Sequence, residues 1–261
     1  MMLDVLQHEL STLDHVALAW FLVAWLGYGP LLHSLKWPQS IASRMKDVRG
    51  GWMHSMLGRD NRIMDASLLG SGMNSATFFA STTMVALAAM IGMLGHFDQT
   101  YSAIENLTFT AKTSRAVVEL KILTLTLVFA HSFLKLTWAL RQLNYCVALM
   151  GAAPLRPEPL HRDTISARAS VALTLAVSSF NAGIRGYYFA LAALAWLLGP
   201  AALATVTAGM VMMLLWRQFG SATAEAIRLS HSAYGFEQAQ AISTPRQEGQ
   251  RQVLSTVTSP Q

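Results

Sequence analysis

The chain has 261 residues, of which 53% are hydrophobic and 13% charged, and its mean hydropathy is +0.37. A soluble domain carries roughly one-quarter charged residues, so this composition argues against a soluble fold and favours one that has lipid as its solvent. The formal net charge of +5 could indicate nucleic-acid binding. The charges, however, flank apolar runs as membrane topology signals do, so no nucleic-acid partner is expected.

The first apolar run is predicted to be a retained membrane span over residues 16–35. No Lys or Arg precedes Lys36, so this run lacks the basic segment of a secretory signal peptide. The single cysteine, Cys146, excludes an internal disulfide and a cysteine-cluster metal site.

A basic connector over 36–68 follows the first span. Its pattern predicts an amphipathic helix that lies in the membrane interface and is interrupted near Gly50-Gly51. A helix packed on the protein's own cytoplasmic face is the open alternative. The apolar residues that recur at helical spacing are Ile41, Met45, Val48, Trp52 and Met56.

The second span, predicted over 69–94, is rich in small residues. They follow a four-residue rhythm that allows close helix contact in lipid. We therefore expect Gly72, Ala76 and Ala80 to pack against a neighbouring helix, from the same chain or another copy. The full row comprises Gly72, Ala76, Ala80, Ala88 and Gly92.

The third span, predicted over 117–140, contains Lys121, His131 and Lys135. Ionisable groups inside a membrane persist mostly where they face a bundle interior, a water-filled cavity or a ligand. The lysines lie near enough to the span's ends to reach an interface. His131 does not reach one easily.

A second basic connector over 141–168 contains a Pro-rich turn and the predicted start, near Asp163, of a cytoplasmic helix. Two further spans, 182–198 and 201–219, are predicted to form a hairpin at Gly199-Pro200. Residues 1–229 thus make up the transmembrane domain, and the Gln-, Ser- and Thr-rich stretch 230–261 is predicted to be a disordered cytoplasmic tail.

The distribution of charge favours an all-α, polytopic transmembrane bundle of five spans. With five spans, both basic connectors and the tail fall on one side, so the positive-inside rule places the N-terminus outside and the C-terminus in the cytoplasm. A count of four, with 182–219 taken as one span, would export the four arginines that follow residue 216. A re-entrant hairpin over 182–219 is kept as an alternative to two spans.

Three long strings carry a family resemblance: NRIMDASLLGSGMNSATFFASTTMVAL (61–87), FLKLTWALRQLNYCVALMGAAP (133–154) and FNAGIRGYYFALAALAWLLGP (180–200). They resemble a family of uncharacterised membrane proteins of bacteria and plants, catalogued as a domain of unknown function. The resemblance covers roughly residues 15–225 and implies a multi-pass helical membrane protein, with no reaction, cofactor or partner. The family is more basic after Asn181, where this chain has Ala182, and this departure weakens an anion site built on that region.

The five-span topology gathers polar residues toward the cytoplasmic half of the bundle. Cations outnumber anions in this group, which suits an anionic ligand such as a lipid headgroup or a small carboxylate. An internal network, with Asp65 paired to Arg185 or Lys135, is the alternative. The candidate ligand-binding residues are His131, Lys135, Arg185, Asn181, Asp65 and Asn74.

No catalytic residue and no metal site are predicted. The chain has no GxSxG, glycine-rich phosphate loop, CxxC or HExxH string. His33 and His131 lie at different depths, so haem is kept only as an alternative and no cofactor is expected. We therefore expect a non-enzymatic protein of the bacterial cytoplasmic membrane that contacts lipids and a homo-oligomeric or other membrane-protein partner. The alternative is a small transporter or channel for an anionic or lipidic substrate, built on His131, Lys135 and Arg185.

Overall fold

The computed structural model of the protein describes residues 10–34, 40–106, 114–233 and 235, and every regular element of this described part is helical. The all-α prediction is confirmed. The elements are α2 (Thr12–Ser34), α3 (Ile41–Leu57), α4 (Ile63–Gly95), α5 (Phe97–Glu105), α6 (Arg115–Ala152), α7 (Pro159–Ala195), the short 3₁₀ helix η1 (Trp196–Leu198), α8 (Pro200–Phe219) and α9 (Ala222–Ala233).

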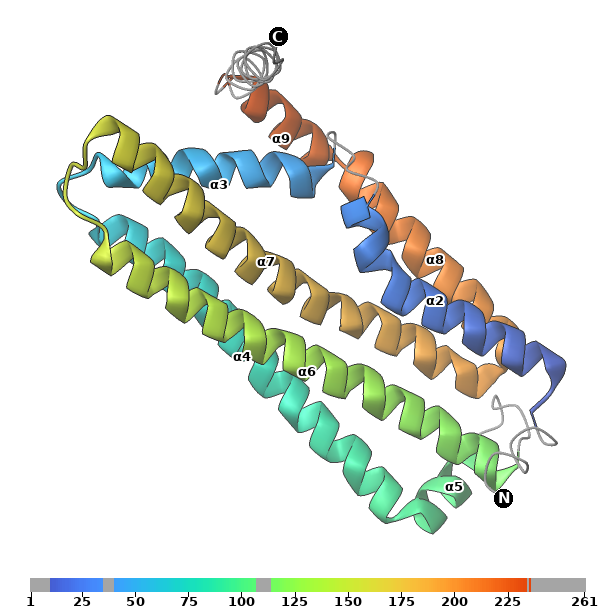
Figure 1. Cartoon of the computed structure of the whole chain (residues 1–261). Coiled ribbons are helices and arrows are strands. Elements are labelled where there is room, and N and C mark those ends of the chain that lie inside the picture. Colours follow the sequence, from blue (N-terminus) through green and yellow to red (C-terminus); the bar gives the residue numbers. More distant parts are fainter. Residues whose placement is uncertain (1–9, 35–39, 107–113, 234, 236–261) are drawn as a thin grey trace, which may run out of the picture.

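The long helices α2, α4, α6, α7 and α8 run along a common direction and form one layered bundle (Figure 1). Helix α6 packs between α4 and α7, α7 contacts α8, and α2 packs mainly on α8. Helix α3 crosses one end of the bundle beside α9, and α5 lies at the opposite end (Figure 1). We call these the α3 end and the α5 end. The chain returns to the same end after every second long helix.

Three described segments are long and apolar enough to cross a membrane: Ile63–Gly95, Arg115–Ala152 and Pro200–Ala233. The predicted spans 69–94, 117–140 and 201–219 fall inside them. Helices α6 and α7 have 38 and 37 residues, which corresponds to about 55 Å at 1.5 Å per residue. A hydrocarbon core of roughly 30 Å accounts for only part of that length.

The buried apolar residues form two separate cores. The α5-end core includes Phe21, Phe189, Trp196 and Leu203, which come from α2, α7, η1 and α8. The α3-end core joins α3 to α4, α6 and α7 through Met53, Met56, Leu57, Leu69, Leu143 and Leu173. Each core thus ties a different set of helices together.

Two glycines of α7 allow that helix to approach α6 closely. A Cβ atom on Gly186 would lie 1.7 Å from Ser132 Oγ, and one on Gly183 would lie 2.5 Å from Leu136 Cγ. Real Cβ atoms cannot come this close to other heavy atoms. Only residues without a Cβ fit at these two positions in the present packing.

The predicted interruption of the connector helix at Gly50-Gly51 is wrong, because α3 is continuous from Ile41 to Leu57. Ser40 caps its start by accepting a hydrogen bond from the Ser43 amide at 3.2 Å. Each helical glycine costs about 1 kcal/mol relative to alanine. Burial of Met53, Met56 and Leu57 stabilises the helix by more than that, at roughly 1.5–3 kcal/mol per large apolar side chain.

Two other boundaries also differ from the prediction. The predicted cytoplasmic helix and residues 182–195 of the predicted span over 182–198 are one continuous helix, α7, and residues 196–198 form η1. Helix α9 takes in residues 230–233 of the predicted tail, and residues 236–261 lie outside the described part. The predicted turn at Gly199-Pro200 is confirmed, since Gly199 has a φ of 129° and α8 begins at Pro200.

Two arginines cap helix C-termini at the α3 end. Arg62 donates to the carbonyl oxygens of Met150, Ala153 and Pro154 at 3.2, 2.8 and 2.7 Å, at the end of α6. Arg162 donates to the His54 carbonyl oxygen in the last turn of α3. These carbonyls have no partner within their own helix, and a cation there also matches the helix dipole.

Candidate functional site

The six candidate ligand-binding residues do not form one cluster. His131 and Lys135 on α6 and Arg185 on α7 are half-buried, whereas Asn74 and Asn181 are exposed. The sixth candidate, Asp65, lies in the first turn of α4 and is fully buried.

Asp65 belongs to a polar tie between α3 and α4. Its Oδ1 accepts a hydrogen bond from Trp52 Nε1 at 2.7 Å and forms an ion pair with Arg59. Oδ2 is buried and has no hydrogen-bond partner among the described residues. The expected pairing of Asp65 with Arg185 or Lys135 is therefore wrong. The sequence did not reveal that α3 folds back over the start of α4.

His131 lies where α6 meets α2. Its ring packs edge-on against Trp25, with the ring centroids 5.3 Å apart. Lys135 is one turn further along α6. The imidazole is thus held against an indole, with the Lys135 ammonium group one turn away.

Arg185 lies where α7 meets α2. Its guanidinium carbon is 5.6 Å from the centroid of the Tyr28 ring, and its Nη2 is 3.4 Å from where a Cβ on Gly29 would be. A cation over an aromatic face gains about 0.5–2 kcal/mol. The guanidinium donates no hydrogen bond to any residue in the described part of the chain.

Sequence reasoning missed three residues of this region: Tyr28, Tyr188 and Arg217. Arg217, in the last turn of α8, donates a hydrogen bond to the Tyr188 hydroxyl at 2.7 Å and lies 5.7 Å from that ring's centroid. The Tyr28 ring faces the Arg185 guanidinium. The spacing of Arg185 and Tyr188 on one face of α7, together with the basic end of the last span, was the available signal.

The predicted packing face of α4 is split between two environments. Ala76 and Ala80 are buried, whereas Gly72 is exposed and a Cβ there would meet nothing within 4 Å. A four-residue step turns a helix about 40° past a full rotation, so such a row winds around the helix. Ala88 and Gly92, further along the row, are also exposed.

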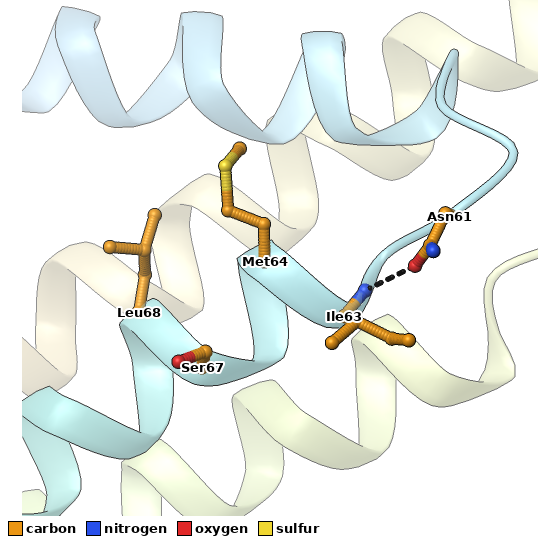
Figure 2. Close-up of a pocket in the computed structure, with 5 residues that line it drawn as sticks. All are labelled: Asn61, Ile63, Met64, Ser67 and Leu68. Atoms are coloured by element: carbon orange, nitrogen blue, oxygen red, sulfur yellow. Dashed lines mark hydrogen bonds between the residues drawn. The ribbon is translucent and has the colours of Figure 1, made fainter.

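An open hollow of about 480 Å³ lies at the start of α4. Figure 2 shows Met64 and Leu68 projecting together from the helix, with Ile63 in another direction and Asn61 in the preceding loop. Asn61 Oδ1 accepts a hydrogen bond from the Ile63 amide at 2.9 Å. The hollow is mainly apolar and contains none of the six candidate residues.

Within the described ranges, no group of three or more His, Cys, Asp or Glu side chains is placed to hold a metal ion. Cys146 is buried in the α3-end core. Arg185 and Arg217 are cations that the rings of Tyr28 and Tyr188 hold in place, and the chemistry that such groups offer is the binding of negative charge.

Comparison with known proteins gives a family without an assigned activity. A family model described as "Protein of unknown function, DUF599" matches residues 16–223. No curated protein and no solved structure matches the chain. The match covers most of the chain and confirms the resemblance of the three sequence strings. The chain belongs to this family of proteins of unknown function.

Proposed function

We propose that this chain is a five-span protein of the bacterial cytoplasmic membrane that acts without catalysis, through contacts of its spans with lipid and with other membrane proteins. The spans are α2, α4, α6, α7 and α8, with the N-terminus outside and the C-terminus in the cytoplasm. The alternating course of these helices supports the proposal (Figure 1).

The charge at the two bundle ends supports this orientation. The α5-end stretches outside the long helices carry acidic residues such as Asp98 and Glu105. The α3 end is strongly basic, as expected for a cytoplasmic side. Its cations on α3, in the loops and on the adjoining ends of α6 and α7 are Arg44, Lys46, Arg49, Arg59, Arg62, Arg141, Arg156, Arg162 and Arg168.

The observation that carries the proposed mode of action is the exposure of α4. Only 11% of its most apolar window is buried inside the protein, against 44% for α6. A helix in contact mainly with α6 leaves the rest of its circumference to lipid or to another protein. Its outward Gly72 would let a second helix approach closely. The large apolar residues on the exposed side are Met64, Leu68, Phe78, Met84, Val85 and Ile91.

The test is the association of the full-length protein in lipid bilayers, measured by energy transfer between labelled copies. Gly72→Leu should weaken association, whereas Gly209→Leu on α8 is the matched control, because a Cβ there also meets nothing within 4 Å. Ala76→Leu is unsuitable, since Ala76 is fully buried within the chain. Equal association of the Gly72→Leu variant, the control and the wild type would reject α4 as the contact surface.

A second candidate function is transport of an anionic or lipidic substrate along the cationic residues His131, Lys135 and Arg185. The lack of an acceptor for Arg185 among the described residues favours it. The test is flux in proteoliposomes with His131→Ala and Arg185→Ala. Unchanged flux in both variants rejects transport through this cluster.

A further inference from the structure

The guanidinium of Arg185 has five N–H donors and no hydrogen-bond acceptor in the described chain. It is half-buried between α7 and α2, next to the Tyr28 ring. An aromatic face attracts the charge but does not accept the N–H donors in the manner of an oxygen. In a membrane, such donors must be satisfied by protein, by water or by a ligand.

The stretches of the helices around Arg185 contain no acidic residue. There is no Asp or Glu between residues 15 and 46, 120 and 157, or 164 and 224. These ranges take in α2 beyond Asp14, most of α6, most of α7 and all of α8. The positive charges of Arg185, Arg217 and Lys135 are therefore not neutralised by the helices that carry them, and a counter-anion has to come from outside these helices.

Arg217 adds a second guanidinium to the same location. Arg217 donates a hydrogen bond to the Tyr188 hydroxyl at 2.7 Å, and Tyr188 lies three residues after Arg185 on the same helix, α7. Arg217 is exposed and follows Trp216, which is 61% exposed. An exposed Trp beside an Arg at the end of a span is typical of the headgroup level of a bilayer.

We propose that Arg185 and Arg217, positioned by Tyr28 and Tyr188, form a binding site for the phosphate group of an anionic phospholipid in the leaflet at the α3 end. Planar guanidinium groups match phosphate oxygens with two parallel hydrogen bonds, and a basic pocket between spans is a known way of holding lipid headgroups. The inference rests on the proposed placement of the chain in a membrane, and it is independent of association through α4.

The experiment uses the full-length protein purified in a neutral detergent and titrated with short-chain phosphatidylglycerol, short-chain phosphatidylcholine or inorganic phosphate. Native mass spectrometry and thermal melting report binding. We expect phosphatidylglycerol to bind more tightly than phosphatidylcholine, and Arg185→Gln or Arg217→Gln to weaken its binding about tenfold. Arg185→Lys should lie between the wild type and Arg185→Gln, because it keeps the charge and loses the planar fork.

Arg168→Gln is the matched control, since it removes the same charge from an exposed position on the same helix. Equal binding of the two lipids, or equal loss in Arg185→Gln and Arg168→Gln, overturns the proposal. If inorganic phosphate displaces phosphatidylglycerol, the same site takes a soluble phosphate-bearing ligand. If inorganic phosphate does not bind, the ligand of the site is the phospholipid. Association of Arg185→Gln copies in bilayers should equal that of the wild type, so a loss of lipid binding in this variant is independent of contacts through α4. Thermal melting of Arg185→Gln without added lipid should also match the wild type, which shows that the variant is folded.

Discussion

Asp14 and Trp196 are hydrogen-bonded across the α5 end of the bundle, with Asp14 Oδ1 accepting from the indole Nε1 at 2.9 Å. Both residues are buried, and Lys121 Nζ lies 5.8 Å from the centroid of the Trp196 ring. Lys121 and Asp14 are opposite charges that interact with the same indole, Asp14 with its N–H group and Lys121 with its ring. The start of α2, the start of α6 and the end of α7 thus meet around one indole ring.

We expect Asp14→Ala to destabilise the protein by about 1–3 kcal/mol, because a buried indole N–H loses its acceptor. Asp14→Asn should be milder toward Trp196, since the amide oxygen can still accept the hydrogen bond. Thermal melting of both Asp14 variants, each measured with Trp196 present and with Trp196→Phe, gives the coupling energy between Asp14 and Trp196. An additive double-mutant cycle would show that the hydrogen bond contributes no coupling energy.

Replacement of Gly186 by alanine should push α7 away from α6, because the new Cβ would lie 1.7 Å from Ser132 Oγ. Overpacking of this kind costs about 1–3 kcal/mol in thermal stability. Gly72→Ala is the control, as its Cβ meets nothing within 4 Å, and there alanine should be neutral or stabilising by about 0.5–1 kcal/mol. Partial recovery of thermal stability in the double variant Gly186→Ala, Ser132→Ala would identify the serine as the obstacle. Equal melting temperatures of Gly186→Ala and Gly72→Ala would contradict the close packing of α6 and α7.

Arg62→Ala should loosen the end of α6, since three carbonyl oxygens lose the donor that caps them. A net loss of about 1–3 kcal/mol is expected from hydrogen bonds to a charged group. Hydrogen exchange should therefore accelerate in the last turns of α6, up to Ala152. Arg168→Ala, at an exposed position, should leave this exchange unchanged, and the same exchange rates in both variants would rule out the capping role.

Acidification should weaken α9. The hydrogen bond from Arg228, with Nε to Glu225 Oε2 at 2.7 Å, holds the pKa of Glu225 below its ordinary value of 4.5. A carboxyl group with a lowered pKa stabilises the fold above the unfolded-state pKa, and this contribution is lost as the pH falls through the folded-state pKa. The loss therefore falls below about pH 4.5, and it should be small, because the pair is exposed.

The measurement is a carboxyl NMR titration of Glu225 in the whole protein, with the α9 chemical shifts recorded in parallel. Arg228→Ala should return the midpoint toward the ordinary value. A midpoint unaffected by that substitution would show that another group lowers the pKa.

The positions of the helices were largely predictable, and their ends were predictable only where local chemistry marks them. Gly199-Pro200 set the start of α8 to within one residue of the prediction, because a proline suits the first turn of a helix. Hydropathy ended the third span at 140, although α6 continues to Ala152. The last turns of α6 contain polar residues and are stabilised by packing in the α3-end core, which a measure of apolar content does not detect.

The partners of the candidate site residues could not be predicted from the sequence. Arg185 was identified because a charged residue inside a span is conspicuous. Its neighbour Tyr28 is an ordinary residue of the first predicted span, and their contact depends on α2 lying beside α7 and α8. Asp65 illustrates the same difficulty, since Trp52 reaches it only because α3 folds back over α4. Helix order in the bundle is a property of packing between distant segments.

The contact between α2 and α8 bears on how the chain assembles during synthesis. Helix α2 leaves the ribosome before the other described helices, yet the helix on which it mainly packs emerges late, with 188 residues between their starts. Helices α4, α6 and α7 can pair in the order in which they are made, and neighbours in sequence pack early. We therefore expect α2 to remain unpaired until α8 is made, so that a chain truncated before Pro200 retains an α4–α6–α7 core and an undocked α2.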